Sequence, residues 1–468
     1  MRDRDAAGAP RTADFSSQLP AAPRHAAAMD ADSLLAAWQR TLARSPDARA
    51  LIDGASGRAW SRSELDLAAR AWLTLLGGGV ELERRRVLFA EPNGVRWFQV
   101  FLGLLHAGAV PVPADPTEPA ENLVAIAGAI GAGAWWRDGS MRAMEPRPPA
   151  ARRRDLCLIK LTSGSTGLPR ARLFTHAQML ADGAQICTSM GIQETDLNLA
   201  VIPLGHSYGL GNLVVPLLAQ GTPVLCSASP LPHALAADCA RWRPTVFPAV
   251  PTLLRALAQA DVAPEALGSL RLVISAGALL PPDVARAFAG RFARNIHSFY
   301  GSSETGGITY DRSGESALSG RGVGTPLDGV RLTFRRGGRF TVESGAVMDP
   351  GRFSPPDRAR LAPDGELVLE GRTGRAIKIG GRRLDPAEVE RALLALPDVR
   401  AACVLTHPER SDALASAVAT GATPAVLRAA LGRSLAPWKI PERIVVVDEL
   451  PVTARGKIDR AAVLALLR

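Results

Sequence analysis

Short apolar segments alternate with amphipathic ones along most of this chain, and no other feature constrains its fold as strongly. The stretch RRVLFAEPNGVRWFQVFLGLLHAGAVPVPAD predicts a strand, a turn at residues 92–94, a helix ending near His106 and a second strand at residues 110–112. A strand–helix–strand unit of this kind joins parallel strands, because the chain must cross back over the sheet between them. The same alternation returns at residues 197–202, 223–226, 245–250 and 270–274.

The pattern changes after residue 320 and again near residue 371. VRLTFRRGGRFTVES and GELVLEGR are short alternating strands with Gly-rich or Asp-Gly turns, typical of antiparallel β structure. DPAEVERALLAL and ERIVVVDEL then predict a Pro-initiated helix and a buried strand. The expected fold is therefore α/β, with a large N-terminal domain of βαβ-type parallel sheets plus a β-rich subdomain, followed by a small mobile α+β C-terminal domain. We place a disordered tail at residues 1–30, the N-terminal domain at 31–371 and the C-terminal domain at 372–468.

Composition narrows the class of protein. The 468 residues are 47% hydrophobic and 21% charged, which is ordinary for folded globular chains and argues against a disordered or collagen-like one. No export signal and no apolar run long enough for a membrane span is visible. The five cysteines form no CxxC pair, as expected of reduced thiols, so we expect a cytoplasmic protein.

The chain is basic, with 55 Lys and Arg residues against 45 Asp and Glu residues. That excess suits a polyanion such as nucleic acid or a nucleotide. The arginine clusters at residues 84–86 and 152–154 are short and lie in no nucleic-acid-binding motif, so a solvated surface is the better interpretation and no nucleic-acid partner is expected. Only four of the basic residues are lysines, and each therefore merits attention: Lys160, Lys378, Lys439 and Lys457.

A loop rich in hydroxyl groups and glycine follows one buried strand, in LIKLTSGSTGLPR. Glycines let backbone N–H groups approach an anion, and the four hydroxyls of the loop add donors. The alternative is a plain flexible linker, but a linker has no reason to follow a strand directly and to end in Pro169 and Arg170. Because the loop lacks the GxxxxGK[ST] pattern of P-loop NTPases, we predict a phosphate site of another type.

Five motifs, in order along the chain, resemble those of the adenylate-forming superfamily, which contains acyl-CoA and aryl-CoA synthetases, peptide-synthetase adenylation domains and luciferases. TSGSTGLPR is similar to the phosphate loop of that family, ISAGALL to its adenine-contacting strand end and YGSSETGG to its nucleotide and magnesium motif. FSPPDRARLAPDGELVLEGRTGRAIKIGGRRLDPAEVE resembles the ribose-binding and hinge segment, and ELPVTARGKIDR the C-terminal catalytic-lysine motif. One match alone is weak, but five in the correct order across residues 32–468 are specific.

The resemblance implies an ATP site built from these motifs. The phosphate loop would hold the β- and γ-phosphates, Tyr300 would stack on adenine and Ser303 would contact the α-phosphate. Glu304 would bind Mg²⁺, a hard ion that takes oxygen ligands, while Asp357 and Arg372 would bind the ribose hydroxyls. The implied ATP site comprises Thr162, Ser163, Gly164, Ser165, Thr166, Gly167, Ala276, Gly277, Ala278, Tyr300, Gly301, Ser302, Ser303, Asp357 and Arg372.

Lys457 is implied to be the catalytic lysine, which bridges the substrate carboxylate and the negative charge that develops at the α-phosphate. A compact, flexible ammonium suits that task better than a planar guanidinium, whereas Lys439 is expected to be structural. Gly374 stands at the implied hinge, where most relatives have Asp or Lys. Gly380 and Gly381 would border the tunnel that admits the pantetheine arm of coenzyme A.

Two further departures from the family pattern affect the implied site. Pro355 and Pro356 replace the usual Thr-Gly before Asp357, so we expect the local backbone to differ there. Arg170 stands where most relatives have lysine. It keeps the positive charge with a different geometry, and its role stays open.

The substrate pocket is indicated by PLGHSYGLGN, whose histidine corresponds to one that lines the carboxylate pocket of many acyl- and aryl-CoA synthetases. Peptide-synthetase adenylation domains place an aspartate in this region, whereas no acid occurs between residues 199 and 220, which disfavours an α-amino acid. A mixed lining suits an aryl acid or an acyl chain. The expected pocket residues are His206, Tyr208, Asn212, Val250 and Ser275.

The sequence thus predicts an ATP-dependent acid–thiol ligase with Lys457, Glu304 and His206 as its catalytic residues. A carboxylate and Mg-ATP would give acyl-AMP and pyrophosphate, and the thiol of coenzyme A would then displace AMP. The alternative acceptor is the phosphopantetheine of a separate acyl carrier protein, loaded with an aryl or fatty acid. A catalytically inactive relative is disfavoured because Lys457 and Glu304 are intact.

Overall fold

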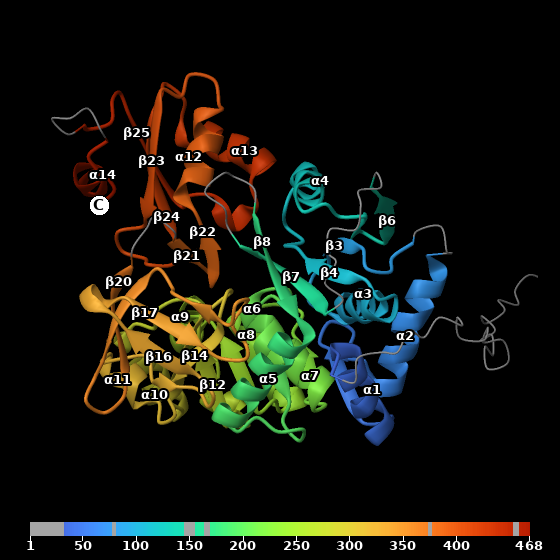
Figure 1. Cartoon of the computed structure of the whole chain (residues 1–468). Helices are drawn as coiled ribbons and strands as arrows, with labels where there is room; N and C mark the ends of the chain where they lie inside the picture. The colour runs from blue at the N-terminus through green and yellow to red at the C-terminus, as the bar shows by residue number, and fades with distance from the viewer. Residues whose placement is uncertain (1–31, 77–80, 145–154, 163–168, 373–376, 453–457) are drawn as a thin grey trace, which may run out of the picture.

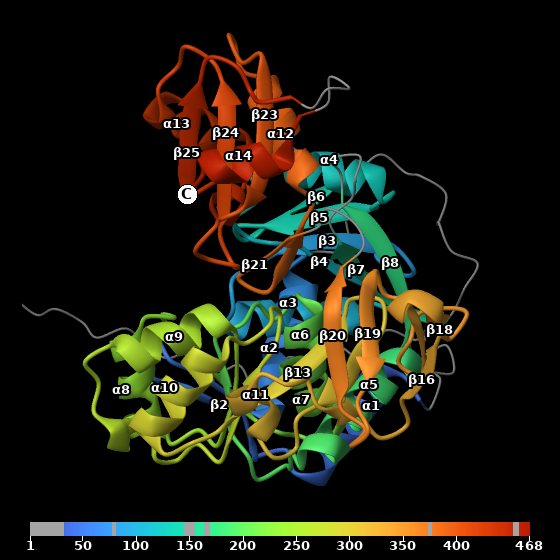
Figure 2. The same cartoon turned by 90° about the vertical axis from the view of Figure 1, so that its left-hand side faces the viewer.

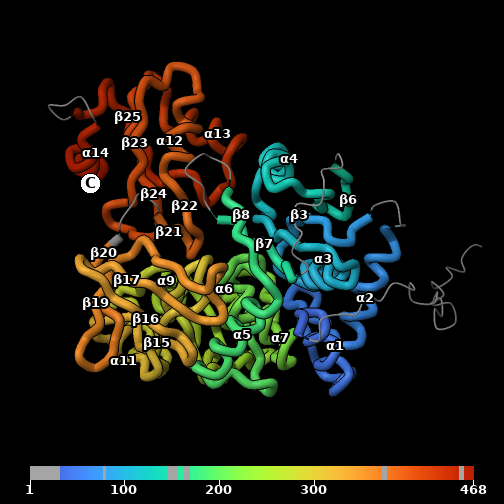
Figure 3. Tube along the Cα trace, in the orientation of Figure 1, coloured from blue at the N-terminus to red at the C-terminus, as the bar shows by residue number. Residues whose placement is uncertain are grey.

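The structure is a computed structural model that describes residues 32–76, 81–144, 155–162, 169–372, 377–452 and 458–468. It consists of a large body that contains β1 to β20 and a smaller body, at the top left of Figure 1, that contains β21 to β25. The chain path in Figure 3 shows α1 to α3 and β16 to β20 at opposite ends of the large body. The tail predicted at residues 1–30 lies outside the described residues.

The large body is organised around a nine-stranded sheet with the order β15-β14-β13-β12-β11-β9-β10-β1-β2. The strands from β1 to β13 in this order pair in parallel, and β2, β14 and β15 pair antiparallel at the edges. Every residue of β11 and β12 is buried, as expected of parallel strands covered on both faces. The bounds are β1 (Arg49–Asp53), β2 (Ala59–Ser61), β9 (Asn198–Ala200), β10 (Val224–Cys226), β11 (Val246–Ala249), β12 (Leu272–Ser275), β13 (Ile296–Ser302), β14 (Gly306–Tyr310) and β15 (Thr325–Pro326).

Helices cover both faces of this sheet. On one face, Leu254 of α9 and Phe288 of α10 share a core with Phe247 of β11. On the other face, α1, α2, α3, α5 and α7 contribute to a core shared with a second sheet, in which the rings of Trp97 and Phe101 stack with centroids 4.9 Å apart. The bounds are α1 (Leu34–Arg44), α2 (Arg62–Leu75), α3 (Val95–His106), α5 (His176–Met190), α6 (Ser207–Gly209), η1 (Leu210–Val214), α7 (Val215–Ala219), α8 (Pro232–Trp242), α9 (Pro251–Gln259), η2 (Pro264–Leu267), α10 (Pro282–Phe292) and α11 (Glu315–Ser319).

The second sheet has the order β4-β3-β5-β6 and contains the predicted strand–helix–strand unit. Strands β3 and β4 are parallel and flank α3, which confirms that prediction. A separate antiparallel ribbon, β7–β8, places Lys160 opposite Arg172. The bounds are β3 (Arg86–Ala90), β4 (Val110–Pro113), α4 (Ala120–Ala129), β5 (Ala134–Arg137), β6 (Ser140–Ala143), β7 (Leu156–Thr162) and β8 (Arg170–Thr175).

The antiparallel β structure predicted after residue 320 is confirmed. It forms a three-stranded sheet, β16-β17-β18, and a two-stranded one, β19-β20. The bounds are β16 (Arg331–Phe334), η3 (Arg336–Gly338), β17 (Phe340–Glu343), β18 (Arg352–Phe353), β19 (Asp357–Leu361) and β20 (Leu367–Arg372).

The smaller body has a hydrophobic core of its own, which includes Leu384, Val389, Leu427 and Ile444. Strands β23, β24 and β25 form its sheet, and the β21–β22 hairpin lies between that sheet and the large body (Figure 1 and Figure 2). No helix in the described ranges is both long and apolar enough to cross a membrane. The bounds are β21 (Ile377–Ile379), β22 (Arg382–Leu384), α12 (Pro386–Leu394), β23 (Ala401–Thr406), β24 (Leu414–Ala419), α13 (Pro424–Ser434), η4 (Pro437–Lys439), β25 (Arg443–Val447) and α14 (Arg460–Leu466).

Candidate active site

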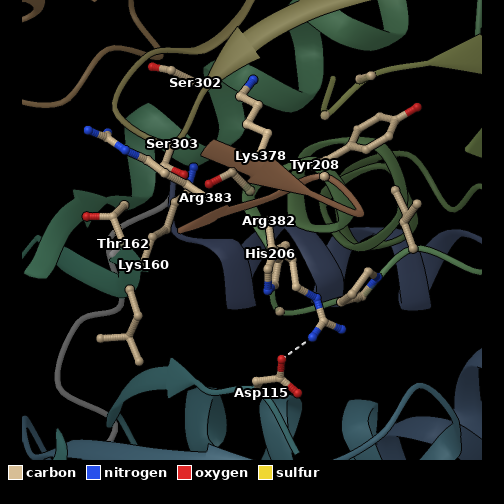
Figure 4. A pocket seen from close by; sticks show the side chains of 18 of the residues that line it. Asp115, Lys160, Thr162, His206, Tyr208, Ser302, Ser303, Lys378, Arg382 and Arg383 are labelled. Carbon is tan, nitrogen blue, oxygen red and sulfur yellow. Dashed lines mark hydrogen bonds and ion pairs between the residues drawn. The ribbon is translucent and has the colours of Figure 1, made fainter. Parts of the chain in front are cut away.

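A cavity lies between the large body and the β21–β22 hairpin (Figure 4). Parallel strands end at the same edge of their sheet, so the segments that follow them meet there. His206 lies beyond the end of β9, Val250 follows β11, Ala276 and Gly277 follow β12, and Ser302 ends β13. The topology of the nine-stranded sheet therefore gathers segments that are far apart in the sequence.

Most of the predicted site residues within the described ranges line this cavity: Thr162, His206, Tyr208, Asn212, Val250, Ala276, Gly277, Gly301, Ser302, Ser303, Glu304, Gly380 and Gly381. Four do not, namely Ser275, Ala278, Tyr300 and Asp357. Ser275 is buried in β12, where consecutive side chains point to opposite faces, so it cannot share the direction of Ala276.

Several predicted residues fall outside the described residues: Ser163, Gly164, Ser165, Thr166, Gly167, Gly374 and Lys457. The backbone of Arg372 ends β20, but its side chain is also outside the description. The roles of these residues stay predictions.

Tyr300 and Asp357 contact each other rather than the cavity. The Tyr300 hydroxyl donates a hydrogen bond to Oδ2 of Asp357 at 2.9 Å. The Tyr300 side chain belongs to a core that includes Ile308 and Val342. The structure therefore links the predicted adenine and ribose segments directly, through a contact that the motifs did not indicate.

Glu304, the predicted metal ligand, is 2% exposed and pairs with two guanidinium groups. Its Oε1 lies 3.3 Å from Arg172 of β8 and 3.5 Å from Arg383 of β22. A buried carboxylate needs partners of this kind, because removing its charge from water is costly. Since Arg383 belongs to the smaller body, Glu304 is also a point of contact between the two bodies.

A second charged contact joins the hairpin to the large body beside His206. Arg382 of β22 forms an ion pair with Asp115, drawn as a dashed line in Figure 4. Burial raises the pKa of Asp115, but Arg382, the hydrogen bonds from Thr117 and the nearby His206 together outweigh burial, so the pKa is lowered. Burial and the nearby Arg382 lower the pKa of His206 to about 4, against the opposing effect of Asp115. His206 is therefore a neutral imidazole at neutral pH, able to form hydrogen bonds without carrying charge.

Three of the four lysines in the chain line the cavity: Lys160, Lys378 and Lys439. Lys439 pairs with Glu118 of the large body and, at 2.9 Å, with Glu388 of α12. This arrangement agrees with the structural role expected for Lys439. The scarcity of lysine is the sequence signal that could have led to Lys160 and Lys378.

Other cavity residues carry no such signal. Asp115, Asp182, Arg382 and Arg383 all line the wall, yet nothing in the sequence separates them from the many other aspartates and arginines. Only the fold shows that these four charges lie in one place.

Two protein-family models match this chain. The model of the AMP-binding enzyme family matches residues 38–135 and 132–335, and that of the AMP-binding enzyme C-terminal domain matches residues 388–457. Benzoate–CoA ligase of Thauera aromatica is 32% identical over 65% of this chain and 65% of its own length, so the chain spans about two thirds of that relative. Feruloyl-CoA synthase of Amycolatopsis sp is 28% identical over 92% of this chain and 98% of its own length.

Solved structures share the fold. The amide bond synthetase McbA from Marinactinospora thermotolerans superposes with a TM-score of 0.79 at 24% identity, covering 93% of this chain and 99% of that one. A double mutant of o-succinylbenzoate CoA synthetase (MenE) from Bacillus subtilis gives a TM-score of 0.78 at 20% identity, covering 91% and 98%. The chain therefore belongs to the AMP-binding enzyme family, within the adenylate-forming superfamily whose motifs its sequence carries.

Proposed function

We propose that this protein is an ATP-dependent acid–thiol ligase that adenylates a carboxylic acid and transfers the acyl group to coenzyme A. In the first step a carboxylate oxygen attacks the α-phosphorus of ATP, which forms acyl-AMP and releases pyrophosphate. In the second step the thiolate sulfur of coenzyme A attacks the acyl carbon and AMP leaves. The observation that carries the proposal is the convergence of the acid-pocket segment, the nucleotide motif and the C-terminal hairpin on one cavity.

The acid pocket favours an aromatic acid. Tyr208 and Phe299 line it with ring centroids 5.8 Å apart, and Ile186 adds an apolar side chain. The Tyr208 hydroxyl donates to the carbonyl oxygen of Ile274 at 3.2 Å, so this residue offers mainly its ring to a ligand. Flat apolar walls of this kind suit an aryl group. The names of two relatives, benzoate–CoA ligase and feruloyl-CoA synthase, support the same class of acid.

We propose that His206 contacts the carboxylate of the acid, since it lines the same cavity as Tyr208. Because its imidazole is neutral, we propose that it donates a hydrogen bond to a carboxylate oxygen and does not act as a cation. The positive charge that the reaction needs would come from Lys457, as the C-terminal motif implies.

Glu304 and its neighbours fit a magnesium ion bound with ATP. Mg²⁺ usually takes one or two carboxylates together with phosphate oxygens, and Glu304 supplies one carboxylate in the cavity wall beside Ser303. When bound, the ion neutralises charge on the phosphates. Arg383 now pairs with the same carboxylate, so we propose that Mg-ATP binding and the Arg383 contact exclude each other.

The turn between β21 and β22 provides an approach for the thiol. A Cβ atom on Gly277 would lie 2.5 Å from the Cα of Gly381, so the two backbones touch and glycine is required at this crossing. A groove lined by Val250, Thr252 and Gly380 opens beside the turn. We propose that the pantetheine arm of coenzyme A follows this groove.

Acceptor choice is tested by offering coenzyme A and a purified holo acyl carrier protein in separate reactions with Mg-ATP and an aryl acid, followed by mass spectrometry. We expect the coenzyme A thioester to form. Gly381→Val should slow thioester formation more than pyrophosphate release, because the added side chain would crowd the turn at Gly277 and Val250. Gly351→Val is the matched control, since Gly351 also has a positive φ of 80° and no neighbour within 4 Å of an added Cβ. Thioester on the carrier protein alone would instead support the other acceptor.

A further inference from the structure

Asp182 is a buried carboxylate in the wall of the cavity. It lies on α5, is 2% exposed and lines the same space as Tyr208 and Phe299. Two glycines from other elements make room for it: a Cβ on Gly211 or on Gly306 would collide with the carboxylate oxygens. The carboxyl group of Asp182 is thus held against the part of the cavity that suits an aryl ring.

The hydrogen-bonding capacity of Asp182 is largely unused. Within the described part of the chain, its carboxylate accepts one hydrogen bond, from the N–H of Gly307 to Oδ1 at 3.0 Å. An ionised carboxylate offers about four acceptor positions. Buried acceptors without partners are costly, so a carboxylate kept in this state is typical of a site that a ligand completes.

Lys160 is the cation that accompanies Asp182. It lies on β7, is 2% exposed and also lines the cavity. Its Nζ makes no hydrogen bond to the residues that the structure describes and lies 4.0 Å from the centroid of the Phe174 ring. Burial lowers the pKa of Lys160 and raises that of Asp182, whereas the attraction between the two charges opposes both shifts. Each charge therefore helps to keep the other ionised.

The neighbours of Asp182 are apolar or aromatic on the side of the proposed aryl group. Ile186 lies one turn further along the same face of α5, and it packs in one hydrophobic cluster with Phe299 and Tyr208. A ring bound between these side chains would have the Asp182 carboxylate as its acidic hydrogen-bond acceptor, beside the uncharged amide of Asn212.

We propose that Asp182 is a specificity-determining residue that accepts a hydrogen bond from a ring hydroxyl or ring amino group of the aryl acid, and that Lys160 acts as a positioning residue that keeps Asp182 ionised. The inference rests on the proposed function. It narrows the substrate class to aryl acids that carry a hydrogen-bond donor away from the carboxylate.

The test compares donor-bearing acids with acids of the same shape that lack the donor. We would measure kcat/KM by pyrophosphate release for 3- and 4-hydroxybenzoate and 3- and 4-aminobenzoate against 3- and 4-methylbenzoate. We expect the wild-type protein to prefer the best donor-bearing acid by about 10- to 100-fold, the effect of one hydrogen bond to a buried charge. The hydroxy and amino series show which donor is preferred.

Three variants test how much the Asp182 carboxylate contributes to the preference for donor-bearing acids. Asp182→Leu should bring the donor preference to about one, because the acceptor is gone. Asp182→Asn can still accept from Gly307 and should retain part of the preference. Lys160→Met keeps an apolar stem against Phe174 but removes the charge, and should lower the preference without abolishing activity on methylbenzoate. Asp328→Asn, at an exposed ion pair with Arg312, is the matched control.

Two results would overturn the inference and leave the ligase proposal standing. One is equal kcat/KM for hydroxy-, amino- and methylbenzoates in the wild type. The other is an equal loss of kcat/KM for all acids in Asp182→Asn and Asp182→Leu, with the preference for donor-bearing acids unchanged. That result would mean that Asp182 only accepts the hydrogen bond from Gly307 and does not contact the substrate. If no acid releases pyrophosphate, the proposed function fails, and calorimetric binding of the same acids to wild type and Asp182→Leu still decides the role of Asp182. Equal binding by the two proteins would overturn it.

Discussion

The two sides of the cavity are built by different forces. On the large body, the wall consists of strand ends and glycine-rich turns that follow completely buried strands such as β11 and β12. On the smaller body, it is a short hairpin whose two arginines, Arg382 and Arg383, reach Asp115 and Glu304 across the gap. Packing sets the shape of the wall on the large body, whereas ion pairs hold the hairpin of the smaller body in place.

The same contrast appears in the contacts that join the two bodies. Asp115, Glu118 and Glu304 are all nearly buried carboxylates of the large body, and each pairs with a cation of the smaller one. The attraction within such a pair roughly offsets the free energy needed to bury its two charges, so the pair adds little net stability. The contact between the bodies can therefore be specific without being strong.

The largest effect is expected on the packed side. Trp97→Ala removes a fully buried ring that stacks on Phe101, and should lower the free energy of unfolding of the large body by about 3–5 kcal/mol. Arg383→Ala should change the same quantity by less than about 1 kcal/mol, because Arg383 lies outside the large body and Glu304 keeps Arg172 as its partner. Urea unfolding followed by tryptophan fluorescence measures both. Similar losses of unfolding free energy in the two variants would contradict the difference between a side built by packing and a side held by charge.

A smaller effect is expected from Lys439, which lies at the junction of the two bodies. Lys439→Met leaves Glu118 and Glu388 nearly buried without their cation, and should cost about 2–3 kcal/mol of docking between the bodies. Small-angle scattering should show a more extended particle. Adding Glu118→Gln should restore part of the compactness, and an unchanged wild-type profile in the single variant would count against charge as the force that holds the junction.

The smallest effect concerns pH. The folded pKa of His206 is lowered to about 4, below the 6.5 of an exposed histidine, so the neutral form persists until the pH approaches 4. Protonation opposes folding here, because the unfolded chain binds the proton more tightly, and stability is lost as the pH falls from about 6.5 toward 4. We expect kcat/KM for adenylation to change by less than about two-fold between pH 5.5 and 7.5 on account of His206. An acid limb near pH 6.5 that disappears in His206→Asn would show an imidazole with an ordinary pKa.

The parts of the molecule built by local packing could be predicted from the sequence. The strand–helix–strand unit of β3, α3 and β4 and the antiparallel β16 to β20 were predictable, because they are local patterns of apolar residues and turns. The strand-end motifs around Gly277 and Glu304 were predictable as well, because they resemble motifs of the adenylate-forming superfamily, and the close backbone approach at Gly277 requires glycine.

Charge pairs between distant segments could not be predicted. Arg382 and Asp115 are separated by 267 positions, and Asp182 meets Gly307 across 125. In a chain with 51 arginines, no pattern tells which one faces a buried carboxylate. The pairing of Tyr300 with Asp357 was missed for the same reason, although both residues had been selected.

The most direct test of the central claim is carboxylate-dependent exchange of radioactive pyrophosphate into ATP over a panel of benzoates, cinnamates and fatty acids. Lys457→Ala is the informative variant, and Arg312→Ala, at an exposed ion pair, is the control. We predict exchange with aryl acids in the wild type and control, and at least about 100-fold less in Lys457→Ala, because the developing charge loses its cation. Folded wild-type protein that binds ATP but exchanges with no acid, or a Lys457→Ala variant with full exchange, would contradict the account.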